Sequence, residues 1–362
     1  MAIDKDQIIE QLRTVNDPEL HRDVVTLGMI KNVTCNNGQV DITLELTTPA
    51  CPLKHVFREE IDKALACFGD EVKKVNIEFT ANVRRVPGQM QAAEKNPLPG
   101  VKHIVAVGAG KGGVGKSTVA VNLAVGLARS GAATGILDAD IYGPSLPTML
   151  GLGDAKLQAA DENTLMPLEA HGLKVMTLGA MVEDGKPLIW RGPMAHNAFQ
   201  QLATQTQWGE LDYLIVDLPP GTGDVPLTMA QLLPLTGAVV VCTPQKVAVD
   251  DASRAVAMFE QLNIPVLGII ENMSYFIGDD GKRYDIFGRG GAEALAEAAD
   301  RPFLGSIPIT MALRENSDSG DPAANFAEGT ELAAQLETLV RNLAGQISMR
   351  AMVGQTEAAA NA

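Results

Sequence analysis

The chain is short of basic residues. Its 362 residues include 29 lysines and arginines against 44 aspartates and glutamates, which gives a formal net charge of −15. Proteins that hold nucleic acid by its phosphates need a basic surface, and a chain this acidic lacks one. We therefore expect no nucleic-acid partner.

Long apolar runs and a disulfide framework are missing as well. The longest apolar stretches, such as Ala238–Cys242, are far shorter than the roughly 20 residues that cross a bilayer. The opening residues, Met1–Asp6, show no basic segment followed by an apolar run, so we expect no signal peptide. We expect a soluble, cytoplasmic protein without a membrane partner, whose few cysteines are reduced thiols. They are Cys35, Cys51, Cys67 and Cys242.

The length of the chain exceeds what a single hydrophobic core usually holds, so we expect two domains. Residues 1–82 predict a small α+β unit, and residues 83–100, with several prolines and glycines, predict a linker. We place the larger domain at residues 101–346. The small and polar residues 347–362 predict a frayed tail.

A hairpin signal stands out within the small unit. Two β-type runs, Leu27–Thr34 and Gln39–Leu46, are separated by the Asn-Asn-Gly sequence at 36–38. A helix that begins at Pro52 and a further strand at Val75–Phe79 complete the expected unit.

From residue 101 onward, apolar strand-like runs alternate with helical patterns. Continuous apolar strands that alternate with helices indicate a mostly parallel sheet covered on both faces. We therefore predict a doubly wound α/β domain. Its strands are expected at His103–Val107, Thr134–Leu137, Val175–Leu178, Tyr213–Val216, Ala238–Cys242, Val266–Ile270 and Phe303–Ile307.

The first of these strands runs into a glycine-rich loop with the phosphate-loop spacing G-x-x-x-x-G-K-S. The glycines let successive backbone N–H groups point into one concavity, and the following helix adds its positive end. We expect Lys116 to reach the terminal phosphates of ATP and the Ser117 hydroxyl to coordinate Mg²⁺. The predicted nucleotide-binding residues are Gly110, Lys111, Gly112, Gly113, Val114, Gly115, Lys116, Ser117 and Thr118.

The same loop also fits the G-x-G-x-x-G pattern of a dinucleotide-binding fold, from Gly108 to Gly113, with Asp138 ending the next strand. That interpretation gives no role to Lys116 and Ser117, so a nicotinamide enzyme is disfavoured. A glycine-rich turn without a ligand is disfavoured too, because each glycine costs chain entropy.

Acidic residues complete the expected site. Asp138 and Asp140 follow the second strand, at the edge where parallel sheets bind ligands, so we expect Asp138 to support Mg²⁺ and Asp140 to orient the attacking water. Asp217 ends a later apolar strand as the acid of a Walker B motif would, near Mg²⁺. Residues 219–224 form a glycine-hinged loop that can respond to a γ-phosphate. Asn272 is placed to read the adenine edge, and an ordinary turn asparagine is the alternative.

Lys111 is an additional lysine at the front of the loop. It cannot easily share phosphates that Lys116 already holds in the same chain. The Gly-Lys-Gly-Gly sequence at 110–113 resembles the deviant Walker A motif of the MinD/ParA/nitrogenase-iron-protein class. That resemblance implies a homodimer in which Lys111 reaches the partner's nucleotide, and a solvated surface lysine is the alternative.

Together these blocks resemble the Mrp/ApbC family of P-loop ATPases, which are iron–sulfur cluster carriers. The matching segments are residues 111–118, 138–145, 190–193, 217–224, 271–275 and 286–291. The N-terminal unit resembles the metal–sulfur cluster assembly domain often fused to such ATPases, through residues 17–20 and 47–52.

The resemblance implies a slow ATP hydrolase that acts as a conformational switch, with Lys111, Lys116 and Asp140 in the reaction. Its partners would be apoprotein clients and an iron–sulfur assembly scaffold. A MinD/ParA-like positioning or regulatory ATPase without a cluster is the alternative. Those proteins usually add a basic DNA-binding surface or an amphipathic tail, and Met349–Gly354 lacks such a run.

One departure concerns the cluster itself. Many family members carry a Cys-x-x-Cys pair shortly after the Asn-Met-Ser-Tyr block, whereas residues 276–284 contain no cysteine, as in the plastid and cyanobacterial branch. Cys51 is the candidate replacement, because the positive end of a helix beginning at Pro52 would favour the thiolate that iron binds. His55 would share its face, although an exposed helix residue is the simpler interpretation. The remaining cysteines are predicted to be core residues: Cys35, Cys67 and Cys242.

Overall fold

The computed structural model divides the chain into two compact units. One consists of Met1–Arg84 with Ala344–Ala362, and the other of Arg85–Leu343. None of the helices in the described part of the chain combines the length and the apolar character that a membrane crossing requires. The structure describes residues 4–18, 22–51, 53–83, 97–140, 143–153, 155–161, 164–181, 192–278 and 280–360.

The N-terminal unit is built on a three-stranded sheet in the order β3-β4-β5, with β3 antiparallel and β5 parallel to β4. The predicted hairpin joins β3 to β4, with Asn37 and Gly38 at φ values of +50° and +81°. Both residue types tolerate this left-handed backbone. The elements are α1 (Lys5–Leu12), β1 (Asn16–Asp17), β2 (Arg22–Asp23), β3 (Ile30–Asn36), β4 (Gln39–Leu46), α2 (Lys54–Leu65), the 3-10 helix η1 (Ala66–Glu71) and β5 (Lys74–Ala81).

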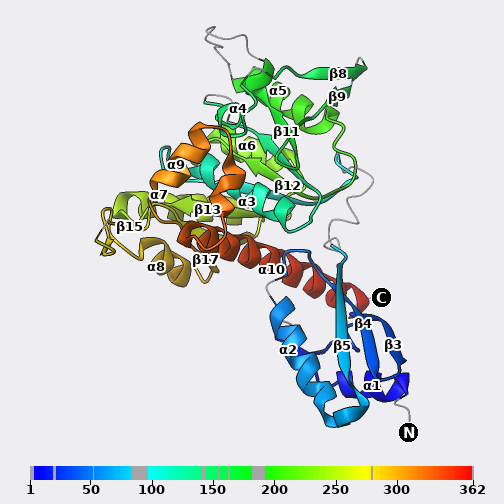
Figure 1. The fold of residues 1–362 in the computed structure, drawn as a ribbon. Coiled ribbons are helices and arrows are strands. Elements are labelled where there is room, and N and C mark those ends of the chain that lie inside the picture. The colour runs from blue at the N-terminus through cyan, green and yellow to red at the C-terminus, as the bar shows by residue number, and fades with distance from the viewer. Residues whose placement is uncertain are drawn as a thin grey trace. The chain divides into compact units, whose positions relative to one another are not determined.

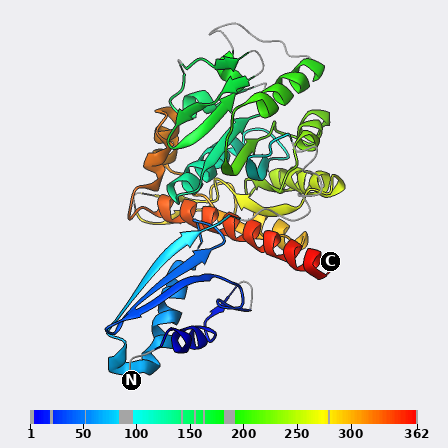
Figure 2. The same cartoon turned by 90° about the vertical axis from the view of Figure 1, so that its right-hand side faces the viewer.

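Alternate side chains of β4 form the centre of this unit's core. Val40, Ile42 and Leu44 are buried against Ile8 of α1 and Phe57 of α2. Because side chains of a strand alternate between its faces, every second residue of β4 is buried. Figure 2 shows both helices packed together beside the sheet.

Two predictions about cysteines are affected by where α2 begins and ends. The helix begins at Lys54, and Pro52 lies outside the described residues, so Cys51 precedes the first helical residue by three positions. Cys67 was predicted to be a core residue, and this is wrong: its side chain is exposed. The α-helix ends at Leu65, and the tighter turn of η1 rotates the following residues away from the buried face. Cys35 is half-buried against the core and Cys242 is buried, as predicted.

The second unit contains an eight-stranded sheet in the order β10-β11-β7-β12-β6-β13-β14-β17. All neighbours are parallel except β10 and β11, which confirms the doubly wound, mostly parallel α/β fold (Figure 1). The strands are β6 (Val101–Gly108), β7 (Thr134–Asp138), β10 (Leu168–Ala170), β11 (Leu173–Thr177), β12 (Leu211–Asp217), β13 (Gly237–Cys242), β14 (Val266–Glu271) and β17 (Phe303–Ser306).

Helices cover both faces of this sheet. Phe199 of α5, Ala230 of α6, Phe259 of α7 and Ala292 of α8 share one core with the sheet. The opposite face carries α3, where a Cβ on Gly126 would collide with α10. Right-handed crossovers explain this division, because β6 connects toward one edge of the sheet and β13 toward the other. The remaining elements are α3 (Lys116–Arg129), α4 (Leu146–Met149), β8 (Gln158–Asp161), β9 (Thr164–Met166), η4 (Leu178–Met181), α5 (Gly192–Gln205), α6 (Asp224–Leu232), α7 (Lys246–Gln261), β15 (Phe276–Ile277), β16 (Arg283–Tyr284), α8 (Gly291–Ala298), α9 (Met311–Asp318), η5 (Pro322–Phe326) and α10 (Glu331–Ala360).

The end of the chain differs from the expected frayed tail. Helix α10 continues through residue 347 and runs to Ala360. Ile347 and Ala351 are buried, and burial of one face stabilises a helix that its composition alone would not.

The sheet order also fixes where a ligand can bind. The loops after β6 and β13 leave this pair of neighbouring strands in opposite directions. Open parallel sheets bind ligands at such a switch point, beyond the carboxyl ends of the strands.

Candidate functional site

The glycine-rich loop lies at this switch point, between the end of β6 and the start of α3. Gly113 and Gly115 have φ values of +79° and +80°, a left-handed backbone that glycine adopts without strain. A Cβ on Gly110 would collide with the backbone carbonyl of Asp251 in α7, so only glycine fits there. No side chain caps the first turn of α3, which begins at Lys116. The loop therefore has the curled backbone that anion binding requires.

Lys116 is the charged centre of the site. Its ammonium lies 2.5 Å from Asp217 Oδ1 and 3.7 Å from Asp140 Oδ2, and it donates to Ser117 Oγ at 3.2 Å. The Lys116 side chain is only 6% exposed. A lysine held this deeply is stable only beside an opposite charge, which Asp217 supplies.

Two buried carboxylates share this position, because Asp138 and Asp217 are register partners on the neighbouring strands β7 and β12. Burial, together with the negative charge of Asp217, raises the pKa of Asp138 to about 7. Burial raises the pKa of Asp217 as well, against the opposing influence of the Lys116 ammonium. Asp217 Oδ2 is buried and has no hydrogen-bond partner among the described residues.

This surplus of carboxylate oxygen fits a divalent cation. No group of three or more His, Cys, Asp or Glu side chains in the described ranges is arranged to hold a metal by itself. A P-loop site does not need one, since Mg²⁺ keeps several waters and takes oxygens from the phosphates and a single hydroxyl. The Ser117 hydroxyl and the unpaired Asp217 oxygen fit that requirement.

Asn272 reaches the loop from the end of β14. Its side-chain amide donates to the Val114 carbonyl at 2.8 Å, and the residue is buried. A Cβ on Gly115 would collide with this amide nitrogen. The structure thus places Asn272 against the loop backbone, and its role in reading adenine stays a prediction.

Lys111 lies half-buried in the loop, at the position following Gly110. Its ammonium forms no ion pair or hydrogen bond with the described residues of its own chain. Its predicted role across a dimer stays a prediction.

Two groups of residues that form hydrogen bonds around the site were not predicted from the sequence. The Thr177 hydroxyl donates to Asp138 Oδ2 at 3.1 Å, because Thr177 ends β11 as the register partner of Asp138. Asn122 of α3 donates to the Thr118 carbonyl at 2.8 Å and accepts a hydrogen bond from Asn325 at 2.9 Å. The signal in the sequence is an amide within the apolar run of α3, but Asn325 is 203 residues away and cannot be identified from it.

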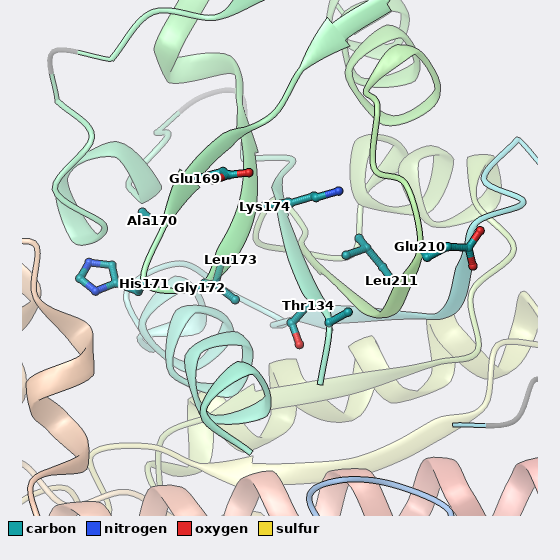
Figure 3. A pocket seen from close by; sticks show the side chains of 10 residues that line it. Thr134, Glu169, Ala170, His171, Gly172, Leu173, Lys174, Glu210 and Leu211 are labelled. Carbon is teal, nitrogen blue, oxygen red and sulfur yellow. The ribbon is translucent and has the colours of Figure 1, made fainter. Parts of the chain in front are cut away.

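A separate pocket of about 400 Å³ opens at the amino ends of β7, β11 and β12, which is the opposite edge of the sheet from the loop (Figure 3). Thr134, Lys174 and Glu210 line it, and Lys174 already donates to the Trp208 carbonyl at 2.6 Å. The pocket brings together no group that the P-loop chemistry uses.

The N-terminal unit places Cys51 half-buried against its core, and the Cys51 backbone N–H donates to the Thr48 carbonyl at 3.2 Å. His55 is exposed. In the part of the chain that the structure describes, they belong to no group of three or more His, Cys, Asp or Glu side chains that could hold a metal ion. A cluster at Cys51 therefore stays a prediction.

Two family models match the chain. Residues 100–344 match the model described as NUBPL iron-transfer P-loop NTPase, and residues 5–79 match the model described as iron-sulfur cluster assembly protein. Together they cover both units. The first match alone spans more than half of the chain.

Curated relatives match over nearly the whole length. An iron-sulfur cluster carrier protein of Deinococcus radiodurans is 51% identical over 349 residues, which cover 96% of this chain and 97% of the relative. A protein of the same name from Synechocystis is 46% identical and covers 96% of this chain and 99% of its own.

Solved structures resemble the larger unit. The nucleotide-binding protein of Archaeoglobus fulgidus, in complex with ADP, has a TM-score of 0.56 and 41% identity over 62% of this chain and 89% of its own. The cell division ATPase MinD of Pyrococcus furiosus has a TM-score of 0.52 and 20% identity, over 66% of this chain and 97% of its own. The second likeness concerns the fold alone.

Proposed function

Because the chain belongs to the NUBPL iron-transfer P-loop NTPase family, we propose that it binds and slowly hydrolyses ATP in order to hold and release an iron–sulfur cluster. The relatives named iron-sulfur cluster carrier protein, which match over both units, support the proposal that the chain carries such a cluster. The glycine-rich loop and its buried Lys116 support the proposal that the chain binds ATP.

The observation that carries the ATPase proposal is the buried pairing of Lys116 with Asp217 inside the glycine loop. Lys116 would exchange this carboxylate for the terminal phosphates of ATP, and Asp217 and Ser117 would then hold Mg²⁺. The metal supplies neutralisation of the charge on the transferring phosphoryl group. The backbone N–H groups of the loop hold the remaining phosphate oxygens.

Asp140 completes the reacting side of the site in this proposal. The Asp140 side chain is 14% exposed and lies next to Lys116. Asp138, in contrast, is buried and is not accessible to solvent. Asp140 is thus the acid that a water molecule can reach, and it would orient that water toward the γ-phosphate. Asp138 would support the metal indirectly.

Lys111 would act on a second copy of the chain. Its ammonium is not used within the described part of its own chain, and Lys116 already serves the nearby phosphates. In a homodimer Lys111 would stabilise the charge on the partner's phosphoryl group, as inserted cations do in phosphoryl transfer. ATP turnover would then change how the two chains of the dimer pack, and with it how tightly they bind the cluster. The chain would receive that cluster from an assembly scaffold and deliver it to apoprotein clients.

The cluster proposal is tested by anaerobic reconstitution of the full-length chain with iron and sulfide, followed by absorbance. Cys51→Ser should remove the charge-transfer bands, and Cys67→Ser, which changes an exposed cysteine of the same unit, should keep them. A wild-type protein that stays colourless would favour the alternative, a positioning ATPase without a cluster. Equal colour in both variants would remove Cys51 from the site.

A further inference from the structure

Two buried side-chain oxygens in the described part of the chain have no hydrogen-bond partner. They are Asp217 Oδ2 and Ser145 Oγ. A buried polar atom without a partner costs free energy, so each one in a folded protein requires an explanation, of which a ligand is one. The Mg²⁺ of the proposed site accounts for the Asp217 oxygen. The Ser145 hydroxyl takes no part in the chemistry assigned to that site and requires an explanation of its own.

The Ser145 hydroxyl does not stabilise the short helix α4 that follows it. Its side chain accepts no hydrogen bond from the first turn of α4. Pro147 stands in that turn and has no N–H, which removes one of the donors that a serine in this position commonly finds. The hydroxyl therefore has no capping role.

The segment that carries Ser145 lies beside the acids of the nucleotide site. A Cβ on Gly179 would lie 3.2 Å from Pro144 Cβ and 3.3 Å from Thr177 Oγ1. The residue before Ser145 is thus a neighbour of Thr177, whose hydroxyl donates to Asp138 Oδ2 at 3.1 Å. This places Ser145 one residue away from the side chains that surround the buried acids.

Backbone hydrogen bonds join the same segment to the reacting side of the site. The Gly143 N–H donates to the Asp140 carbonyl at 3.3 Å, and the Asp140 N–H donates to Asp138 Oδ1 at 3.0 Å. The Asp140 carboxylate lies 3.7 Å from the Lys116 ammonium, which would meet the terminal phosphates. Ser145, two residues after Gly143, is therefore held near the place where those phosphates would lie.

A free hydroxyl is useful at this place because the γ-phosphate needs donors. Its charge is spread over three terminal oxygens, which are stabilised by hydrogen-bond donors and cations. Asp140 supplies no donor, since a carboxylate accepts hydrogen bonds. The hydroxyls of Ser117 and Thr177 already have partners. Ser145 has a hydroxyl hydrogen that no described acceptor takes.

We propose that Ser145 recognises the γ-phosphate of ATP by donating a hydrogen bond to one of its terminal oxygens. This rests on the proposed function and adds to it a residue that distinguishes ATP from ADP. ADP lacks the acceptor, so the hydroxyl stays unpaired when ADP is bound. The nucleotide-free chain keeps an unpaired hydroxyl because only ATP supplies its partner.

The test is isothermal titration of the full-length chain with MgADP and with a non-hydrolysable ATP analogue and Mg²⁺. Ser145→Ala should bind the analogue at least about tenfold more weakly than wild type, because a hydrogen bond to a charged group is lost. Its dissociation constant for MgADP should change by less than about twofold, which also shows that the unit is folded. The ratio of the two constants measures recognition of the γ-phosphate.

Ser130→Ala is the matched control. Ser130 is a half-buried serine of the same unit, but its hydroxyl donates to the Gly126 carbonyl at 2.9 Å, at the far end of α3. Without nucleotide, Ser130→Ala should lower the melting temperature because a hydrogen bond is lost, whereas Ser145→Ala should keep or raise it because no partner is lost. Ser130→Ala should keep the wild-type ratio of the two dissociation constants.

The proposal is overturned if Ser145→Ala keeps that ratio. It is also overturned if Ser145→Ala lowers the melting temperature of the nucleotide-free chain as Ser130→Ala does, because the hydroxyl would then have a partner without ATP. A wild-type chain that binds both nucleotides, with an unchanged ratio in Ser145→Ala, removes this proposal alone. A wild-type chain that binds neither nucleotide removes the proposed function, and this proposal with it.

Discussion

The glycines of the phosphate loop differ in whether they tolerate a side chain. Gly115 combines a left-handed backbone with a position where a Cβ would collide with the Asn272 amide. Gly112 has neither constraint, since its nearest atom to a Cβ is Pro220 Cγ at 4.0 Å. The two glycines of one loop therefore differ in what they tolerate.

Substitution of these glycines tests the difference. Gly115→Ala should lower the free energy of unfolding by about 1–3 kcal/mol, because it adds backbone strain and displaces Asn272. Gly112→Ala, the matched control, should change it by less than about 0.5 kcal/mol. Chemical denaturation without nucleotide measures both. Equal losses in the two variants would contradict the assigned geometry.

The cysteines should differ in reactivity because their side chains differ in burial. Burial and the nearby negative charge of Glu271 raise the pKa of the Cys242 thiol to about 12, whereas the Cys67 side chain is exposed. Because the thiolate is the reactive form, Cys67 should react first with a thiol reagent at pH 8 and Cys242 only after unfolding. Mass spectrometry of the labelled peptides measures the order. Rapid labelling of Cys242 in the native chain would contradict it.

At the scale of elements, Tyr275, the residue before the hairpin β15–β16, is joined to the first residue of α10 by its hydrogen bond to Glu331. Burial and this bond raise the pKa of Tyr275 to about 12, above its ordinary value of 10. A raised pKa means that the neutral hydroxyl stabilises the fold below pH 10. That contribution is lost as the pH rises from 10 to 12, since the unfolded chain releases its proton first.

Tyr275→Phe tests this connection. The variant should lose about 1 kcal/mol of stability at pH 8, because Glu331 loses a hydrogen-bond donor. Its stability should then fall less steeply than that of wild type above pH 10. Urea denaturation at several pH values measures both effects. Parallel pH profiles for the two proteins would contradict the assignment.

Elements also show what the sequence can and cannot predict. The parallel strands of the large sheet, the glycine loop and the acids at the ends of β7 and β12 were predictable, because each is a local pattern of apolar runs and turn residues. The edge strand β10 (Leu168–Ala170) was not predicted, because it is short and carries no continuous apolar run. Thr177 beside Asp138 was not, since it depends on which strands become neighbours. The exposure of Cys67 was missed because the change from α2 to η1 leaves no periodic signal.

At the scale of the whole molecule, the account requires two chains for one reaction. Lys111→Ala should bind MgATP as wild type does, because Lys116 and the loop backbone hold the phosphates of the same chain. Its hydrolysis should fall by at least about a hundredfold, in the range that an inserted cation contributes to phosphoryl transfer. A phosphate-release assay measures the rate. Unchanged turnover would remove the lysine from the partner's site.

All of these proposals depend on the glycine loop with its buried lysine gripping the phosphates of a nucleotide. The direct measurement is isothermal titration of the full-length chain with MgATP and with MgADP. We predict one site per chain in wild type and at least about tenfold weaker binding in Lys116→Ala, which lacks a charge-assisted contact to phosphate. A wild-type chain that releases no heat with either nucleotide, and gains no thermal stability from them, would contradict the account.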